Sequence, residues 1–324
     1  MMTTPILEIR NLRVDYPLYG SCLHAVRDVS LSLEKNEILG IIGESGSGKS
    51  TLGAAILNLL PTPGRIVSGE ILVEGTDILK LSASRLNEFR GSKVTYVPQG
   101  AQNALNPVFT IETQIADPIR FHKKISWKEA RERARDALAL VSIPRERSNQ
   151  YPHQFSGGMK QRALIAVALA LGSKIVILDE PTTALDVLVQ KQIFELVEKI
   201  RSDFGTSFIL ISHDLGVVSS VCDRIAIMYA GKLVEIAPTR KIFESPQHPY
   251  TRALIGSIPR LRFSREALIP IRGTPPNLAE VPPGCPFHPR CKYAIELCSQ
   301  LVPELREIAG DTFASCHRIG ELDD

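Results

Sequence analysis

The stretch EILGIIGESGSGKS, residues 37–50, decides the fold of this chain. It opens with a short apolar run typical of a buried parallel strand and continues into a glycine-rich loop at residues 43–48. The glycines let backbone N–H groups turn toward phosphate oxygens, and a helix expected to begin near Lys49 adds the partial positive charge of its N-terminus. Because strand and helix flank the loop, a chance run of glycine and serine is disfavoured. The pattern predicts that Lys49 reaches the β- and γ-phosphates of a nucleotide and that the Ser50 hydroxyl binds Mg²⁺.

A second segment, ILDEPTTALD at residues 177–186, carries two adjacent acids at the end of an apolar strand. At such a strand end Asp179 can hold Mg²⁺, directly or through water, and Glu180 can polarise the water that attacks the nucleotide. Paired acids at a strand end can also be merely solvated, and the two residues alone do not decide between these interpretations.

A third segment, FSGGMKQR at residues 155–162, contains Ser156, Gly157 and Gly158 ahead of a run that is apolar nearly all round, residues 163–171. A buried helix that begins at Ser-Gly-Gly offers a second cradle of backbone N–H groups for an anion. One chain does not need two cradles for one triphosphate. The alternative is an ordinary helix start.

The rest of the first 240 residues alternates strands with helices. Residues 6–14 and 26–33 alternate apolar and polar side chains as half-buried strands do, and residues 174–178 and 207–211 are strongly apolar strands. Helical spacing of apolar residues predicts helices over 127–142 and 187–204. Strands that alternate with helices indicate an α/β core with a parallel sheet.

The character of the chain changes after about residue 240. Ten prolines between Pro246 and Pro289 break any long element, so we expect a loop-rich appendage. This appendage also holds a cluster of cysteines: Cys285, Cys291, Cys298 and Cys316. In a reducing cytosol such a cluster is more often metal-binding than disulfide-bonded.

Composition limits the function classes. The apolar share of 44% is enough for a real core, and a net charge of +3 without an all-basic run gives no argument for nucleic acid as a partner. The N-terminus has no secretory signal pattern, and the most apolar stretch, residues 163–178, is interrupted by Gly172, Ser173 and Lys174. We therefore expect a cytosolic protein whose role at a membrane, if any, depends on a partner that spans it.

The three segments in this order resemble the ATP-binding-cassette (ABC) ATPases, over most of the chain. The resemblance implies an α/β fold with a RecA-like core, an N-terminal antiparallel β subdomain, a helical subdomain inserted at about residues 85–160, and a loop-rich extension that contains the cysteines. The expected domains are residues 1–240 for nucleotide binding and 241–324 for the extension. It also implies that ATP is shared between two subunits, because the family's Ser-Gly-Gly cradle faces the γ-phosphate held by the partner.

The resemblance assigns roles to single residues. Residues 181–186 resemble the family's D-loop, His213 occupies the position of the switch histidine, and Gln99 matches the glutamine that senses Mg²⁺ and water. Tyr16 lies 27 residues before Gly43, where the family has an aromatic that stacks on adenine, and Tyr19 is the second candidate. The implied catalytic residues are Lys49, Gln99, Glu180 and His213, and those for Mg²⁺ are Ser50, Gln99 and Asp179. The implied ATP-binding residues are Tyr16, Gly43, Glu44, Ser45, Gly46, Ser47, Gly48, Lys49, Ser50, Thr51, Gln99, Ser156, Gly157, Gly158 and Asp179.

Further segments point to one branch of the family. HPYTRAL at 248–254, GTPPNL at 273–278 and CPFHPRC at 285–291 resemble the ATPases of oligopeptide/dipeptide importers, and so does Met159 where most ABC proteins have glutamine. The branch implies an ATP-hydrolysing subunit, peripheral on the cytosolic face of the inner membrane, that powers import of di- or oligopeptides. The implied partners are a paralogous ATP-binding subunit in a heterodimer, two permease subunits and, indirectly, an extracytoplasmic binding protein, with a homodimer as the alternative.

Two rival functions are weighed on the same residues. Within the branch, the same machinery serves importers of oligosaccharide, nickel or glutathione. The distant rival is a soluble ABC ATPase that works on nucleic acid or the ribosome. Such machines typically carry two cassettes or a long coiled-coil insertion, whereas this chain has one cassette and no heptad run.

The four cysteines predict a metal centre. They are separated by five, six and seventeen residues, unlike the pairs two to four residues apart that zinc sites usually use. The subfamily resemblance implies a [4Fe–4S] cluster with a structural role, because the proline-rich appendage has few apolar residues to bury. The alternatives are Zn²⁺, in which case His288 or His317 could replace a thiolate, and cysteines that bind no metal.

Overall fold

The computed structural model describes residues 4–100, 104–258 and 271–322, and the chain divides into two compact units. The first unit contains Met1–Ile6, Glu34–Glu37 and Asp77–Ile211, and the second contains Leu7–Leu33, Ile38–Thr76 and Ser212–Asp324. The phosphate loop belongs to the second unit, and the acidic strand end at Asp179 belongs to the first.

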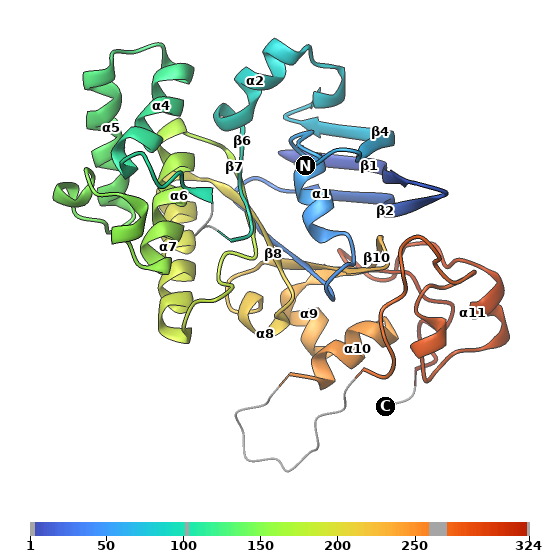
Figure 1. Ribbon diagram of the computed structural model, residues 1–324. Helices are drawn as coiled ribbons and strands as arrows, with labels where there is room; N and C mark the ends of the chain where they lie inside the picture. The colour runs from blue at the N-terminus through green and yellow to red at the C-terminus, as the bar shows by residue number, and fades with distance from the viewer. Residues whose placement is uncertain (1–3, 101–103, 259–270, 323–324) are drawn as a thin grey trace. The chain divides into compact units, whose positions relative to one another are not determined.

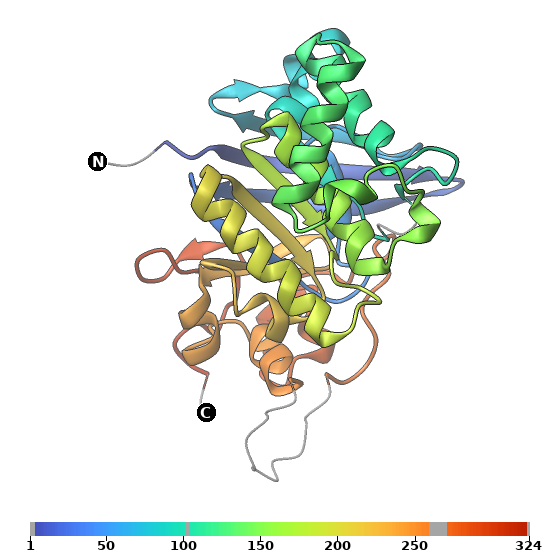
Figure 2. The same cartoon turned by 90° about the vertical axis from the view of Figure 1, so that its left-hand side faces the viewer.

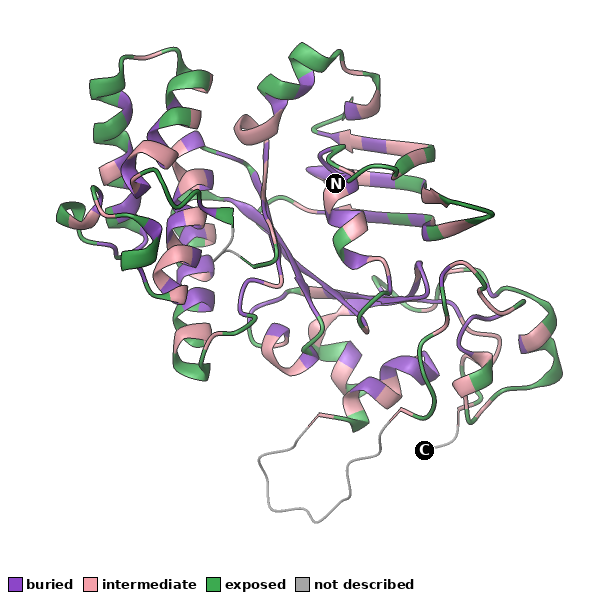
Figure 3. Cartoon of the chain, in the orientation of Figure 1, coloured by how far each residue is buried: buried purple, intermediate pink, exposed green. Residues whose placement is uncertain are grey.

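The first unit is built on a parallel sheet. Strand β7 (Ile175–Asp179) pairs with β6 (Val94–Val97) on one side and with β8 (Ser207–Ser212) on the other. Every residue of β7 and β8 is buried, as Figure 3 shows, which explains why both read as continuous apolar runs. The carboxyl end of β7 carries Asp179, and Glu180 follows it directly.

Helices make up the rest of the first unit. They are α2 (Ala83–Ser92), α4 (Ile111–Lys123), α5 (Trp127–Leu140), α6 (Gly157–Leu171) and α7 (Val187–Phe204), with short 3₁₀ turns η1 (Ile78–Lys80), η2 (Arg145–Arg147) and η3 (Pro152–Gln154). Helices α4, α5 and α6 pack against one another (Figures 1 and 2). Side chains of Ser126, Ser156 and Asp186 cap α5, α6 and α7. The predicted helix at 187–204 is confirmed, and the one at 127–142 ends two residues early because Ser142 turns left-handed, with φ 61°.

The second unit holds two sheets. In the first, β1 (Leu7–Leu18) pairs antiparallel with β2 (Ser21–Leu33) and with β4 (Arg65–Val73), and β5 (Thr76–Asp77) follows. In the second, β3 (Ile38–Ile42) pairs in parallel with β9 (Arg224–Tyr229), which pairs antiparallel with β10 (Lys232–Pro238). Beyond β10 lie β12 (Phe313–Ala314) and β11 (Arg306–Glu307). The C-terminal residues therefore extend the sheet that carries the phosphate loop.

Short helices complete the second unit. They are α1 (Lys49–Ala55), α8 (Leu215–Val218), α9 (Thr239–Glu244), α10 (Pro249–Gly256), η4 (His288–Arg290) and α11 (Glu296–Gln300). Helix α9 packs on β9 and β10. Within the described residues, no helix combines the length and the apolar character needed to cross a bilayer. The predicted boundary at residue 240 stays a prediction.

Candidate functional site

The phosphate loop connects β3 to α1 and requires its glycines. Gly46 and Gly48 have φ of 77° and 100°, a region that other residues rarely adopt. A Cβ atom at Gly43 would lie 2.2 Å from the Met228 carbonyl oxygen, and one at Gly48 would lie 2.2 Å from that of Ala25. The neighbouring strands thus press directly on the loop backbone, which fixes its curvature.

Lys49 and Ser47 face the inside of this loop. The Lys49 side chain is buried, and its Nζ atom donates hydrogen bonds to the carbonyl oxygens of Gly43 (2.8 Å) and Glu44 (2.9 Å). The Ser47 hydroxyl is also buried and has no hydrogen-bond partner among the described residues. A buried hydroxyl without a partner costs free energy, so its place in a glycine-rich loop fits a ligand with acceptor oxygens, as a phosphate has.

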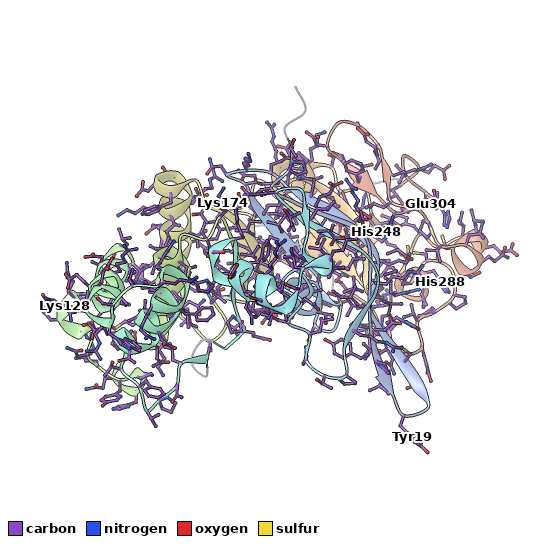
Figure 4. The ribbon with its side chains drawn as sticks, turned by 90° about the horizontal axis from the view of Figure 1, so that it is seen from above. Tyr19, Lys128, Lys174, His248, His288 and Glu304 are labelled. Atoms are coloured by element: carbon purple, nitrogen blue, oxygen red, sulfur yellow. The ribbon has the colours of Figure 1, made fainter. Side chains whose placement is uncertain are left out.

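The two candidates for adenine stacking differ in surroundings. Tyr16 is half-buried on β1, and its ring lies so close to Gly64 that a Cβ atom there would be 2.5 Å from it. Tyr19 lies at the tip of the β1–β2 hairpin and points into solvent (Figure 4). The packed ring is the one held in a fixed orientation, which favours Tyr16.

The acidic strand end of the first unit brings three predicted residues together. Asp179 is buried at the end of β7, and its Oδ2 accepts a hydrogen bond of 2.5 Å from the hydroxyl of Tyr96. The Oε2 atom of Glu180 accepts hydrogen bonds from Gln99 Nε2 (2.8 Å) and from Thr183 Oγ1 (3.0 Å). Glu180 has φ 46°, an unusual value for a residue with a side chain, and strained residues cluster at functional sites.

The Ser-Gly-Gly segment starts α6. The Ser156 hydroxyl accepts a hydrogen bond from the backbone N–H of Met159, so it serves as the N-cap. Gly158 is buried, and a Cβ atom there would lie 2.5 Å from Val189 of α7. Close packing against α7 therefore requires the second glycine, while the start of α6 remains exposed at Ser156.

His213 is exposed directly after β8 and belongs to the second unit, as the phosphate loop and Tyr16 do. Gln99, Ser156, Asp179 and Glu180 belong to the first unit. The roles assigned to all of these residues stay predictions.

The four cysteines of the second unit converge on one small cavity, which His248, His288 and His317 also line. The burial of the thiols raises the pKa of Cys285 to about 12 and that of Cys291 to about 11. The backbone N–H of Arg318 lies 3.3 Å from the Cys316 sulfur and donates to it. The four thiols line one cavity, but among the described residues no three ligand atoms at this cavity lie within 4.8 Å of one another, so a metal centre here stays a prediction.

Two histidines at this cavity are engaged with backbone carbonyl groups. The ring Nδ1 of His288 lies 2.9 Å from the Cys285 oxygen, and the ring Nε2 of His317 lies 2.9 Å from the Leu301 oxygen. Elsewhere in the described residues, the ligand atoms of Asp15, Cys22 and His24 lie within 4.8 Å of one another on the β1–β2 hairpin. There, Asp15 Oδ1 and His24 Nδ1 already lie within hydrogen-bond distance of each other, at 2.8 Å.

Sequence reasoning missed two kinds of residue near these sites. Tyr96 carries no motif, and only its place on β6 beside the end of β7 brings it to Asp179. Arg290 lies in the CPFHPRC segment, yet its side chain pairs with Glu44 of the phosphate loop. The spacing of residues along the chain predicts neither contact. The only signal for Arg290 is its place in the CPFHPRC segment.

Comparison with known proteins agrees with the fold and the motifs. The family model described as ABC transporter matches residues 26–183, and the one described as oligopeptide/dipeptide transporter, C-terminal region, matches residues 234–298. The dipeptide transport ATP-binding protein DppD of Bacillus subtilis is 47% identical over 92% of this chain and 90% of its own length. The oligopeptide transport ATP-binding protein OppD of Escherichia coli is 41% identical over 97% of this chain and 93% of its own length.

Solved structures show the same class. A dimeric structure of the ATP-binding cassette MJ0796 bound to ADP and Pi matches 72% of this chain and 99% of its own, with a TM-score of 0.65 and 28% identity. The structure of CbiO1 from Clostridium perfringens matches 74% of this chain and 91% of its own, with a TM-score of 0.64 and 26% identity. Fold and loop thus define an ABC-type ATPase, and the predicted ABC-type α/β fold is confirmed, whereas the Cys-containing extension stays a prediction. The chain belongs to the ABC transporter ATP-binding proteins that carry the oligopeptide/dipeptide C-terminal region.

Proposed function

We propose that this ATPase powers the import of dipeptides or oligopeptides through a membrane permease. The observation that carries the proposal is the relation to DppD and OppD over more than nine-tenths of the chain, including the C-terminal region. Since these relatives are named for peptide transport, peptides are favoured over oligosaccharide, nickel or glutathione. The chain has a single cassette and little net charge, so its sequence does not support a soluble ATPase that acts on nucleic acid or the ribosome.

The residues fit ATP with Mg²⁺. The buried Ser47 hydroxyl and the curved loop suit a phosphate. Lys49 would contact the β- and γ-phosphates, and the Ser50 hydroxyl would bind Mg²⁺, as the motif predicts. On the acidic strand end, Asp179 would hold Mg²⁺, and Glu180 would orient and polarise the attacking water. Gln99, hydrogen-bonded to Glu180, would report the state of that carboxylate.

Two exposed apolar regions support the proposed partners. Val187 and Leu188, at the start of α7 after the D-loop, are 81% and 66% exposed, which suits burial against a second ATP-binding subunit. We propose a heterodimer with a paralogous subunit, and a homodimer is the alternative. Val108 and Phe109, just ahead of α4, are 70% and 50% exposed and suit a permease subunit. The protein would thus lie on the cytosolic face of the inner membrane, and a binding protein outside would deliver peptide.

Co-purification tests this proposal. The tagged chain, purified from membranes of its own cell in mild detergent, should bring down two permease proteins and a second ATP-binding protein of similar size. If the recovered permeases work with a binding protein that prefers nickel, glutathione or oligosaccharide, the proposed substrate is wrong. Recovery with ribosomes or nucleic acid, and without membrane proteins, would overturn the proposal.

For the cysteine site we propose a structural [4Fe–4S] cluster held by Cys285, Cys291, Cys298 and Cys316. The convergence of all four thiols on one cavity supports it, and Zn²⁺ is the alternative. Protein purified without oxygen should be brown, with broad absorbance near about 400 nm. Colourless protein with about one zinc per chain would contradict the iron assignment. Serine at any one of the four positions should make the C-terminal region more sensitive to protease.

A further inference from the structure

A partly buried ion pair links the cysteine segment to the phosphate loop. Arg290 Nη1 lies 2.6 Å from Glu44 Oε2 and Nη2 lies 3.0 Å from Oε1, so the contact is bidentate. The Arg290 side chain is 6% exposed and that of Glu44 is 24% exposed. A guanidinium taken out of water is tolerated only with well-placed partners, and the planar fork suits a carboxylate held in one orientation.

Glu44 is held at its backbone as well as at its side chain. Its N–H donates to the Tyr250 hydroxyl at 3.0 Å, and its carbonyl oxygen accepts from Lys49 Nζ at 2.9 Å and from the Ser47 N–H at 3.2 Å. Every polar group of this one residue is therefore occupied. The loop between Gly43 and Ser47 cannot change its curvature without breaking at least one of these contacts.

Arg290 is itself fixed from the C-terminal side. It ends the turn η4, immediately before Cys291, and its Nε donates to the Arg272 carbonyl oxygen at 2.8 Å. The Tyr229 hydroxyl accepts from Arg290 Nη1 at 3.2 Å. The rings of Tyr229, Tyr250 and Phe287 pack on one another with centroid separations of 4.7–5.3 Å. Figure 4 labels His288, the first residue of the same turn.

We propose that Arg290 is a positioning residue for nucleotide binding. Together with Tyr250 it holds Glu44, and through Glu44 the phosphate loop, in the shape that receives the phosphates. Arg290 does not touch the nucleotide in this account, and it acts only through Glu44. The C-terminal extension thereby contributes to ATP affinity as well as to the fold. The inference rests on the proposed binding of ATP at the loop.

Calorimetric titration of the full chain with a non-hydrolysable ATP analogue and Mg²⁺ tests this. Arg290→Ala should raise the Kd about ten-fold, which is within the usual range for coupled sites. Arg290→Lys should have an intermediate effect, because it keeps the charge and loses the fork. Glu44→Gln should raise the Kd by a similar factor. Because both substitutions break the same contact, the Kd of the double variant should not exceed the larger of the two single-variant Kd values.

The controls separate positioning from folding and from the proposed function. Arg240→Ala removes an exposed arginine of the same unit, which pairs with the exposed Glu244, and should leave the Kd unchanged. The thermal midpoint of each variant is measured in parallel. If Arg290→Ala lowers the midpoint but keeps the wild-type Kd, or if the two substitutions add fully, the inference fails. If the wild-type chain itself does not bind the analogue, the proposed function fails instead.

Discussion

At the scale of single residues, Glu180 is the one that we expect to polarise the attacking water. Its backbone is left-handed, with φ 46°, and Gln99 and Thr183 donate hydrogen bonds to its Oε2 atom. Glu180→Gln should reduce ATP hydrolysis about 10²- to 10⁴-fold, because general-base assistance is worth that much. Binding of ATP should persist, leaving a closed dimer with trapped ATP.

Turnover of the purified complex and nucleotide retention measure this. Glu195→Gln is the matched control, because it makes the same change of charge on the exposed side of α7 and should hydrolyse ATP normally. Near-wild-type hydrolysis by the Glu180 variant would remove Glu180 from the mechanism.

His248 predicts a pH dependence of stability. It is buried, and burial lowers its pKa to about 3 from an ordinary value of 6.5. Between these values the unfolded chain binds a proton that the folded chain does not, so the free energy of unfolding should fall as the pH is lowered. The slope is about 1.4 kcal/mol per pH unit for one proton. Its Nδ1 accepts from the Tyr250 N–H at the start of α10.

Replacement by asparagine isolates this effect, because asparagine also caps helices and does not titrate here. Denaturant unfolding of His248→Asn, followed from about pH 6.5 down to pH 3, should show a flatter dependence than the wild type. Parallel slopes for wild type and His248→Asn would contradict the assignment.

Residues with local signals could be predicted, and those fixed by distant contacts could not. Lys49, Asp179 and Glu180 follow from strand ends and a glycine loop, which the chain encodes within a few neighbours. Tyr96 meets Asp179 across 83 residues, and Arg290 meets Glu44 across 246. No periodicity records such separations.

At the scale of elements, α6 and α7 pack most tightly at Gly158, and Arg162 of α6 also donates a hydrogen bond to Gln192 of α7. Because a Cβ atom at Gly158 would lie 2.5 Å from Val189 Cγ1, Gly158→Ala should lower the free energy of unfolding by about 1–3 kcal/mol, the usual cost of overpacking. Val189→Ala in the same chain should recover most of that loss. A double variant no more stable than Gly158→Ala alone would show that the crowding lies elsewhere.

The ATP hydrolysis rates of the same two variants test whether the Ser156–Gly158 cradle contacts a nucleotide. If Gly158 serves only the packing of α6 on α7, activity should return together with stability in the double variant. If the cradle meets a nucleotide held by a partner, activity should stay low after stability returns, and we expect this second result.

Long periodic elements were predictable and short ones were not. Helix α7 was placed at its observed bounds because eighteen residues give a clear 3.6-residue period. Strands β11 and β12 have two residues each, so they carry no alternation, and only pairing with β10 makes them strands. For the same reason the sequence did not reveal that the extension continues the sheet of the phosphate loop.

At the scale of the whole molecule, we expect ATP hydrolysis to require more than one chain. The phosphate loop and the Ser156 cradle are expected to act on nucleotides shared between two subunits, so a strictly monomeric preparation should hydrolyse ATP poorly. Sedimentation analysis with a turnover assay on the same sample checks this. Full, permease-coupled turnover by the monomer would contradict it.

Uptake of labelled peptide into vesicles tests the central claim most directly. The chain is reconstituted with its co-purifying permeases and ATP-binding partner, with ATP on the side that represents the cytosol and the binding protein loaded with peptide on the other. The account predicts uptake that requires ATP and that disappears with Glu180→Gln, while Glu195→Gln supports normal uptake. Uptake that continues with Glu180→Gln, or ATP hydrolysis without any peptide movement in the wild-type complex, would contradict it.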